Sequence, residues 1–168
     1  NFKEGVAILP FAIEWEGICP QNTTRRSFVC SVIRGDFLKY YMGIDGGGTK
    51  TAFCLGRDDK KPLYCLRRSG CSYQEIGPDA VVNLITEGVG ALLAEANITA
   101  GDCGGCCIGL PCYGENKKMD VSIEAKLVNA LAPIPVYIVN DGVVGWAGSL
   151  ECGEGVHLVA GTGSIAFG

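Results

Sequence analysis

The alternation of apolar and polar positions becomes regular from Leu38 onward, and it divides the rest of the chain into short strands and helices. Each predicted strand is a short run of apolar residues, bounded by turn-forming residues or by the end of a helix. Five segments meet this description: 40–45, 51–57, 62–68, 106–110 and 136–139. The last of these is apolar throughout, as is typical of a buried strand in a parallel sheet.

Three further segments have the spacing of helices: 78–97, 117–131 and 141–150. The first is expected to bury one face, formed by Val81, Ile85, Val89, Leu92 and Ala96. The second is expected to turn four residues inward: Val121, Ala125, Val128 and Leu131. The resulting order, β-β-β-α-β-α-β-α, is a meander followed by crossovers, and it predicts an α/β domain.

Composition excludes several classes of protein. The 168 residues are 48% hydrophobic and 19% charged, which indicates a folded domain. The net charge is −4 and no basic run exceeds two residues, so nucleic-acid binding is disfavoured. No apolar run approaches the roughly 20 residues of a membrane helix, and no secretory leader pattern begins the chain. We therefore expect a cytoplasmic protein without a membrane or nucleic-acid partner.

The ten cysteines raise the question of a metal or redox site. The segment 103–107 contains a Cys-x-x-Cys pair, but no second pair at matching spacing accompanies it, and His157 is the only histidine. Several cysteines lie in or beside predicted strands: Cys54, Cys65, Cys106, Cys107 and Cys112. We expect reduced, buried thiols that pack as small apolar side chains.

The segment 45–51 reads Asp-Gly-Gly-Gly-Thr-Lys-Thr and directly follows the first predicted strand. Its glycines let backbone N–H groups approach an anion. A phosphate-binding turn is predicted from Gly46, Gly47, Gly48, Thr49, Lys50 and Thr51. Asp45 is placed to hold a hydrated Mg²⁺. An ordinary tight hairpin is the alternative interpretation.

A second glycine-hydroxyl turn lies near the C-terminus between two apolar segments and comprises Gly161, Thr162, Gly163 and Ser164. Two such turns in one short chain favour two loops around the same polyphosphate. Neither turn is a P-loop or a dinucleotide-binding fingerprint, because the P-loop spacing is absent and each turn leads into a strand pattern. His157, in the strand before the second turn, is expected to be structural.

Residues 1–37 show no sustained period. They are either an appended segment that packs on the domain, or sequence outside the native coding frame with the true start at Leu38.

The element order and the two turns resemble domain I of the actin-like ATPase superfamily, which has a ribonuclease-H-like fold and includes sugar kinases and Hsp70. Within it, the chain is similar to the branch of N-acetylglucosamine kinases and BadF/BadG/BcrA/BcrD-type ATPases. The similarity rests on 45–51, 161–164 and Asn140-Asp141, and it covers about 38–168. It implies three parts: an unassigned 1–37, domain I over 38–150, and the first hairpin of a truncated domain II over 151–168.

This resemblance implies phosphoryl transfer from ATP, with Mg²⁺, to an amino sugar, most simply N-acetylglucosamine. Asp141 would be the general base, although a plain helix N-cap is its alternative role. The sugar would bind at the carboxyl ends of the strands. The residues implied there are Ser72, Tyr73, Cys112, Tyr113, Gly114, Glu115, Asn116 and Asn140. The alternative is that these segments are simply polar loops.

Two other functions stay open within the same fold. One is an ATPase that activates a dehydratase or reductase through an iron–sulfur cluster, and the other is a sugar or nucleotide sensor without activity. Because most of domain II is missing from the sequence, we expect the 168 residues alone to bind ATP poorly and to turn over little. A homodimer is expected only for a longer protein.

Overall fold

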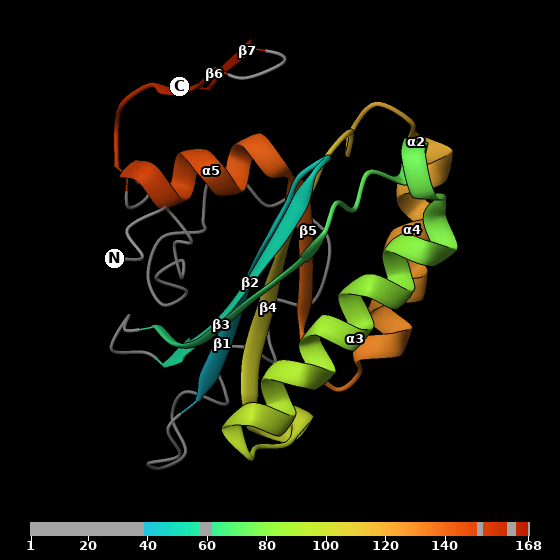
Figure 1. The fold of residues 1–168 in the computed structure, drawn as a ribbon, viewed down its shortest axis with the longest axis vertical. Coiled ribbons are helices and arrows are strands. Elements are labelled where there is room, and N and C mark those ends of the chain that lie inside the picture. Colours follow the sequence, from blue (N-terminus) through green and yellow to red (C-terminus); the bar gives the residue numbers. More distant parts are fainter. Residues whose placement is uncertain (1–38, 58–61, 151–152, 161–163, 168) are drawn as a thin grey trace, which may run out of the picture.

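A computed structural model of the chain describes residues 39–57, 62–150, 153–160 and 164–167. Its centre is a sheet of five strands in the order β3-β2-β1-β4-β5 (Figure 1). The strands are β1 (Tyr40–Gly46), β2 (Lys50–Arg57), β3 (Pro62–Ser69), β4 (Cys103–Leu110) and β5 (Val136–Asn140). The first three pair antiparallel, whereas β4 and β5 run parallel to β1. The predicted meander with crossovers is confirmed.

Helices cover both faces of the sheet. The helices α3 (Pro78–Ala96) and α4 (Lys117–Leu131) pack against one face, and α5 (Asp141–Leu150) contacts β4, β5 and β1 on the other (Figure 1). Along β4, Cys106 and Ile108 belong to the core beneath α3 and α4, while Cys107 packs with Val144 of α5. This alternation is the two-residue period of a strand that is buried on both sides.

The buried face of α3 matches the prediction. Val81, Ile85, Val89 and Leu92 are each at most 2% exposed, and Ala96 packs at the margin of the same core. Pro78 begins the helix, where its missing N–H leaves no bond unmade.

The inward face predicted for α4 is wrong in three of its four positions. Val121 and Val128 are 57% and 46% exposed, and Ala125 is also exposed. The helix instead buries Asp120, Ile123, Leu127 and Leu131, so only Leu131 was placed correctly. The buried face of α4 therefore includes a carboxylate beside three aliphatic residues. Asp120, in the first turn of α4, is buried there because it accepts a hydrogen bond from Gly114 N in the preceding loop.

The structure also corrects the prediction of reduced cysteines. Cys54 and Cys65 stand directly opposite each other on the antiparallel strands β2 and β3, and they form a disulfide. Opposed residues on such strands have neighbouring Cβ atoms, but the register that pairs them is not evident from the sequence alone. Among the residues that the structure describes, Cys71, Cys103, Cys106 and Cys112 carry free thiols.

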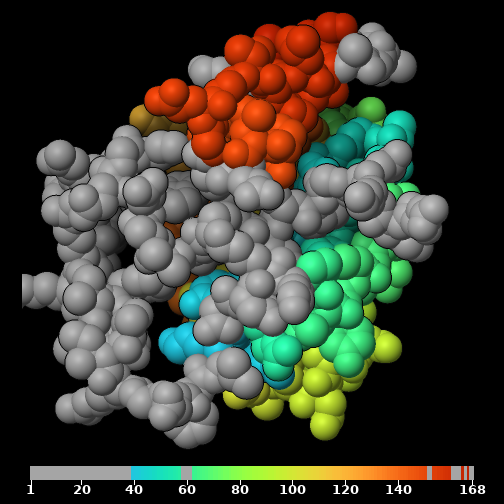
Figure 2. Space-filling view, turned by 90° about the vertical axis from the view of Figure 1, so that its left-hand side faces the viewer, coloured from blue at the N-terminus to red at the C-terminus, as the bar shows by residue number. Residues whose placement is uncertain are grey.

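After α5, the strands β6 (His157–Ala160) and β7 (Ser164–Phe167) form an antiparallel hairpin. The hairpin contacts α5, and Figure 2 shows these elements as the orange and red surface at the top of the molecule. The hairpin predicted to follow residue 150 is therefore present, while the division of the chain into two domains stays a prediction. No helix among the described residues combines the length and the apolar character that crossing a membrane requires.

Candidate active site

A cavity of about 320 Å³ lies where the carboxyl end of β1 meets the start of α5 and the hairpin. The turn after β1 contributes one wall, with Gly46, Gly47, Thr49 and Lys50. Both predicted acidic residues, Asp45 and Asp141, line it as well. The structure thus brings together the magnesium carboxylate, the general base and most of the first phosphate turn expected from the sequence.

Neighbouring backbone holds the glycine turn in place. The N–H of Gly47 donates to Lys50 O at 2.9 Å, and the Gly47 carbonyl accepts from Cys71 N at 3.0 Å. A Cβ at Gly46 would collide with the thiol of Cys71 and the carbonyl of Gly109. A Cβ at Gly48, in contrast, would meet no protein atom within 4 Å. Gly46 is therefore explained by packing, whereas Gly48 has open space beside it that a ligand could approach.

The two threonines of the turn lie in different environments. Thr49 is exposed and lines the cavity together with Lys50. Thr51 is fully buried, and its hydroxyl donates a 2.8 Å hydrogen bond to Ser69 O on β3. Thr51 therefore stabilises the β2–β3 pairing in this structure, and its contact with a phosphate stays a prediction.

The two carboxylates share an environment that disfavours their charge. Burial raises the pKa of Asp45, and the nearby Asp141 raises it further, while Lys50 and His157 lower it. Burial also raises the pKa of Asp141, against hydrogen bonds from backbone N–H groups that lower it. Two neighbouring carboxylates supply oxygen ligands that suit a divalent cation with retained waters.

One face of α5 forms the opposite wall. Asp141, Gly145 and Ser149 are spaced four residues apart, so they lie along one side of the helix, and all three line the cavity. His157 of β6 also lines it, and its Nδ1 lies 2.8 Å from Ser149 Oγ. A Cβ at Gly145 would stand 2.8 Å from His157 Nε2, so the glycine makes room for the ring.

Sequence reasoning missed Gly145, Ser149 and the cavity-facing position of His157. The four-residue spacing from Asp141 could have indicated the first two. His157 was expected to be structural, and its bond to Ser149 does join the hairpin to α5. Its place in the cavity depends on how the hairpin folds back, for which the sequence holds no local signal.

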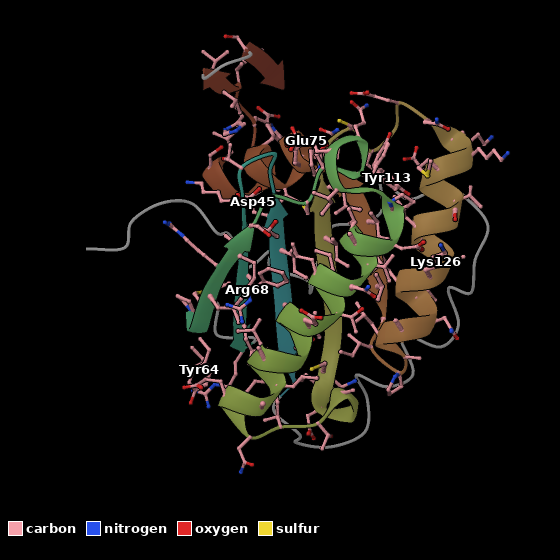
Figure 3. The ribbon with its side chains drawn as sticks, turned by 45° about the vertical axis from the view of Figure 1, so that its right-hand side comes forward. Asp45, Tyr64, Arg68, Glu75, Tyr113 and Lys126 are labelled. Atoms are coloured by element: carbon pink, nitrogen blue, oxygen red, sulfur yellow. A yellow bond between two sulfur atoms is a disulfide. The ribbon has the colours of Figure 1, made fainter. Side chains whose placement is uncertain are left out.

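The residues implied for sugar binding form a second group beside the cavity. They comprise Ser72, Tyr73, Cys112, Tyr113, Gly114, Glu115, Asn116 and Asn140, and none of them is among the described residues that line it. Charge nevertheless links the groups, because Glu115 raises the pKa of Asp141 and Asp141 raises that of Cys112. Figure 3 shows Asp45, Glu75 and Tyr113 at the same end of the sheet.

Several of these polar groups already bond within the protein. Asn116 Oδ1 caps α4 by accepting from Met119 N, and Glu115 accepts from Gln74. Tyr113 donates to Glu124, and burial followed by that carboxylate raises its pKa to about 12. The amide of Asn140 bonds at both ends, to Tyr113 O and from Gly142 N.

Three residues of the second predicted phosphate turn, Gly161, Thr162 and Gly163, lie outside the described residues. Ser164 is described, and it is an exposed residue at the start of β7. Its contact with a phosphate stays a prediction, as does the interpretation of residues 1–37.

Residues 42–168 match the sequence profile of the BadF/BadG/BcrA/BcrD ATPase family. The chain belongs to this family. The match includes both glycine turns, Asp45 and Asp141, and it agrees with the resemblance inferred from those motifs.

Two curated relatives of this BadF/BadG/BcrA/BcrD family member are sugar kinases by name. The chain is 30% identical over 132 residues to the N-acetylmuramic acid/N-acetylglucosamine kinase of Clostridium acetobutylicum, covering 78% of this chain and 42% of that protein. It is 29% identical over 140 residues to the N-acetyl-D-glucosamine kinase of Dictyostelium discoideum, covering 76% and 43%. The chain thus spans less than half the length of either relative.

Solved structures confirm the fold. A candidate N-acetylglucosamine kinase from Chromobacterium violaceum superposes with a TM-score of 0.59 at 24% identity, covering 78% of this chain and 45% of that one. The inorganic polyphosphate/ATP-glucomannokinase of an Arthrobacter species superposes with a TM-score of 0.54 at 25% identity, covering 76% and 57%.

The free cysteines of this family member do not gather into a metal site among the described residues. No group of three or more His, Cys, Asp or Glu side chains there could hold a metal ion. Burial raises the pKa of Cys103 to about 11 and also raises the pKa of Cys106, so these thiols resist forming the thiolates that bind iron. The iron–sulfur alternative has no supporting observation in this part of the chain.

Proposed function

We propose that this chain carries the first domain of an ATP-dependent kinase that phosphorylates an amino sugar, with N-acetylglucosamine as the first candidate substrate. The observation that carries the proposal is the joint placement of Asp45, Asp141 and most of the glycine turn around one cavity, which Gly46, Gly47, Thr49 and Lys50 line. Phosphoryl transfer needs these three parts, namely a carboxylate for the metal, a carboxylate for the attacking hydroxyl, and donors for the phosphates.

The residues around the cavity fit MgATP. The exposed Thr49 and Lys50 and the open side of Gly48 offer hydroxyl, ammonium and backbone N–H donors to phosphate oxygens. Asp45 would hold the metal through water, since Mg²⁺ commonly keeps several waters when only one or two carboxylates are available. When bound, Mg²⁺ neutralises charge on the phosphates and relieves the repulsion between Asp45 and Asp141.

Asp141 is placed to act as the general base. Its Oδ1 accepts a 3.0 Å hydrogen bond from Gly142 N at the start of α5, which fixes the carboxylate at the cavity wall. The positive end of the helix dipole favours its ionised form. From this position the carboxylate would accept the proton of a sugar hydroxyl as that hydroxyl attacks the terminal phosphoryl group.

The amino-sugar assignment is supported by the names of the two curated relatives. The sugar would lie between Asp141 and the loop that follows β4, because Glu115 and Cys112 of that loop interact electrostatically with Asp141. In this arrangement Tyr113, Glu115 and Ser72 lie on the sugar side and the glycine turn on the phosphate side.

The test is to incubate the full product of the gene encoding this chain with MgATP and each of several sugars. Formation of a sugar phosphate is followed by ³¹P nuclear magnetic resonance, with N-acetylglucosamine, N-acetylmuramic acid, glucosamine and glucose as acceptors. We expect stoichiometric ADP and sugar phosphate with an N-acetylated sugar. ATP hydrolysis that no sugar accelerates would contradict the kinase assignment, and sugar binding without turnover would favour a sensor.

A further inference from the structure

The loop after β4 is held from three sides by the side chains of Tyr73, Asp120 and Asn140, of which only Asn140 belongs to the motifs that carry the family resemblance. Three consecutive residues each have one backbone group bonded in this way. Tyr73 Oη donates to Cys112 O at 3.0 Å, and Asn140 Nδ2 donates to Tyr113 O at 3.1 Å. Gly114 N donates to Asp120 Oδ2 at 3.1 Å.

The three side chains come from separate elements. Tyr73 belongs to the short helix α2 (Tyr73–Ile76), Asp120 to the first turn of α4, and Asn140 to the last position of β5. Tyr73 and Asp120 are only 8% and 7% exposed. Their hydrogen bonds are partly buried, where an unmade bond costs more than at the surface, so these contacts restrict the loop.

The backbone of this loop requires such restraint. Cys112 has φ of 64° and Gly114 has φ of 99°, both in the left-handed region. A non-glycine residue occupies that region at an energetic disadvantage and persists there only when its surroundings impose it. The bonds on the carbonyl of Cys112 and on the N–H of Gly114 impose it here.

Asn140 connects this loop to the start of α5. While its Nδ2 bonds the loop at Tyr113, its Oδ1 accepts from Gly142 N at 3.0 Å. Gly142 N also donates to Asp141 Oδ1 at 3.0 Å, so Asn140 and Asp141 share one donor. Any rotation of the Asn140 side chain therefore alters both the loop and the group that orients the Asp141 carboxylate.

We propose that Asn140 is a positioning residue that aligns the Asp141 carboxylate with the loop 112–114, and that Tyr73 and Asp120 fix the other two points of that loop. The inference rests on the proposed function for its catalytic consequence, but the restraint itself is a property of the loop. Asn140 was expected to bind sugar directly. With both ends of its amide engaged, it acts on the substrate through Asp141 and the loop.

Amide hydrogen exchange tests the restraint without any assay of activity. In Asp120→Ala the Gly114 amide loses its acceptor, and we expect its exchange to accelerate at least about tenfold. Asp120→Asn retains an acceptor oxygen and should restore most of the protection. The Cys106 amide, which donates to Pro135 O at 2.8 Å, is the internal reference and should not change. Equal exchange rates of the Gly114 amide in wild type, Asp120→Ala and Asp120→Asn would overturn the proposed restraint of the loop.

Steady-state kinetics of the full gene product tests the alignment. Because a misplacement of about 1 Å can reduce turnover about 10²-fold, Asn140→Ala should lower kcat by about that factor and change KM for MgATP less than threefold. Asn129→Ala is the matched control, since Asn129 is an exposed asparagine on α4. Tyr73→Phe removes only the hydroxyl that donates to Cys112 O and keeps the aromatic ring, so it should not disturb packing. This variant should lower kcat by a smaller factor than Asn140→Ala.

The outcomes separate the alignment from the proposed function. A kcat of Asn140→Ala within twofold of wild type, or a KM for MgATP that rises as kcat falls, would overturn the alignment. If Asn140→Ala does not fold, Tyr73→Phe decides by the same two parameters. A wild-type protein without sugar-dependent turnover would overturn the proposed function. The restraint of the loop 112–114 would then be tested by the exchange measurement alone.

Discussion

The carboxylate of Asp141 raises the pKa of Asp45, although Asp45 lies in β1, Asp141 directly follows β5, and β4 separates these two strands. Gly109 of β4 makes this proximity possible. A Cβ at that position would stand 3.2 Å from the Cα of Asp141 and 2.8 Å from Val144 Cγ2. The absence of a side chain at Gly109 therefore lets α5 pack close to the sheet and brings Asp141 toward Asp45.

The Asp45 carboxylate should destabilise the ligand-free protein at neutral pH. Its folded pKa is raised, so its contribution to stability is fully present below the unfolded value of about 3.8 and is lost as pH rises through the folded pKa. We expect Asp45→Asn to have a higher Tm than wild type at pH 7 without Mg²⁺, and the difference to vanish below about pH 4. Thermal unfolding at several pH values measures this.

Asp102 should have the opposite effect to Asp45, because its carboxylate should stabilise the protein at neutral pH. It accepts two hydrogen bonds of 2.7 Å from Thr99, which lower its pKa, so its contribution is present above the unfolded pKa and is lost as pH falls through the folded pKa. Asp102→Asn should lower Tm at pH 7. An Asp45→Asn protein that is no more stable than wild type at pH 7 would contradict the account of the cavity.

Two glycines of α3 should respond oppositely to alanine. At Gly88 a Cβ would lie well inside contact distance of the Phe53 ring, which is fully buried. We expect Gly88→Ala to lower the free energy of unfolding by about 1–3 kcal/mol. At the exposed Gly90 a Cβ meets nothing within 4 Å, so Gly90→Ala should raise it by up to about 1 kcal/mol. Urea denaturation compares them, and equal effects would refute the packing argument.

The orientation of α4 in the structure predicts different effects for two alanine substitutions, one on its buried face and one on its exposed face. Ile123 is fully buried, and Ile123→Ala should cost about 2–5 kcal/mol of unfolding free energy. Val128, which is 46% exposed, should tolerate alanine within about 0.5 kcal/mol. If Val128→Ala were the more destabilising of the two, the helix would present the face that the sequence spacing suggested.

The outcome for α4 shows which parts of the fold the sequence could predict. The strands were predictable from short runs of apolar residues between turn residues, and α3 from the helical spacing of Val81, Ile85 and Val89. In α4 two apolar stripes compete, and the one containing Val121 lost because Asp120 is used inside the protein, bonded to Gly114. A tertiary bond of this kind leaves no periodic trace.

Some residues of the candidate site could likewise be predicted from local sequence, whereas others depend on tertiary contacts. Asp45, the glycine turn and Asp141 were predictable because each is a compact local motif at the end of a strand. Thr51 shared that motif, yet its hydroxyl faces Ser69 on the neighbouring strand, a contact set by strand register. His157 enters the cavity only because the hairpin returns to α5, so no local pattern could have placed it there.

The most direct test of the central claim is the rate of sugar phosphate formation by Asp141→Asn in the full gene product. Asparagine keeps an oxygen acceptor for Gly142 N but cannot accept the hydroxyl proton. We predict that kcat with N-acetylglucosamine falls about 10²- to 10⁴-fold while MgATP binding, measured by calorimetry, is retained. Asp79→Asn, an exposed aspartate on α3, is the matched control and should leave kcat unchanged. An Asp141→Asn protein that phosphorylates the sugar at the wild-type rate would contradict the account.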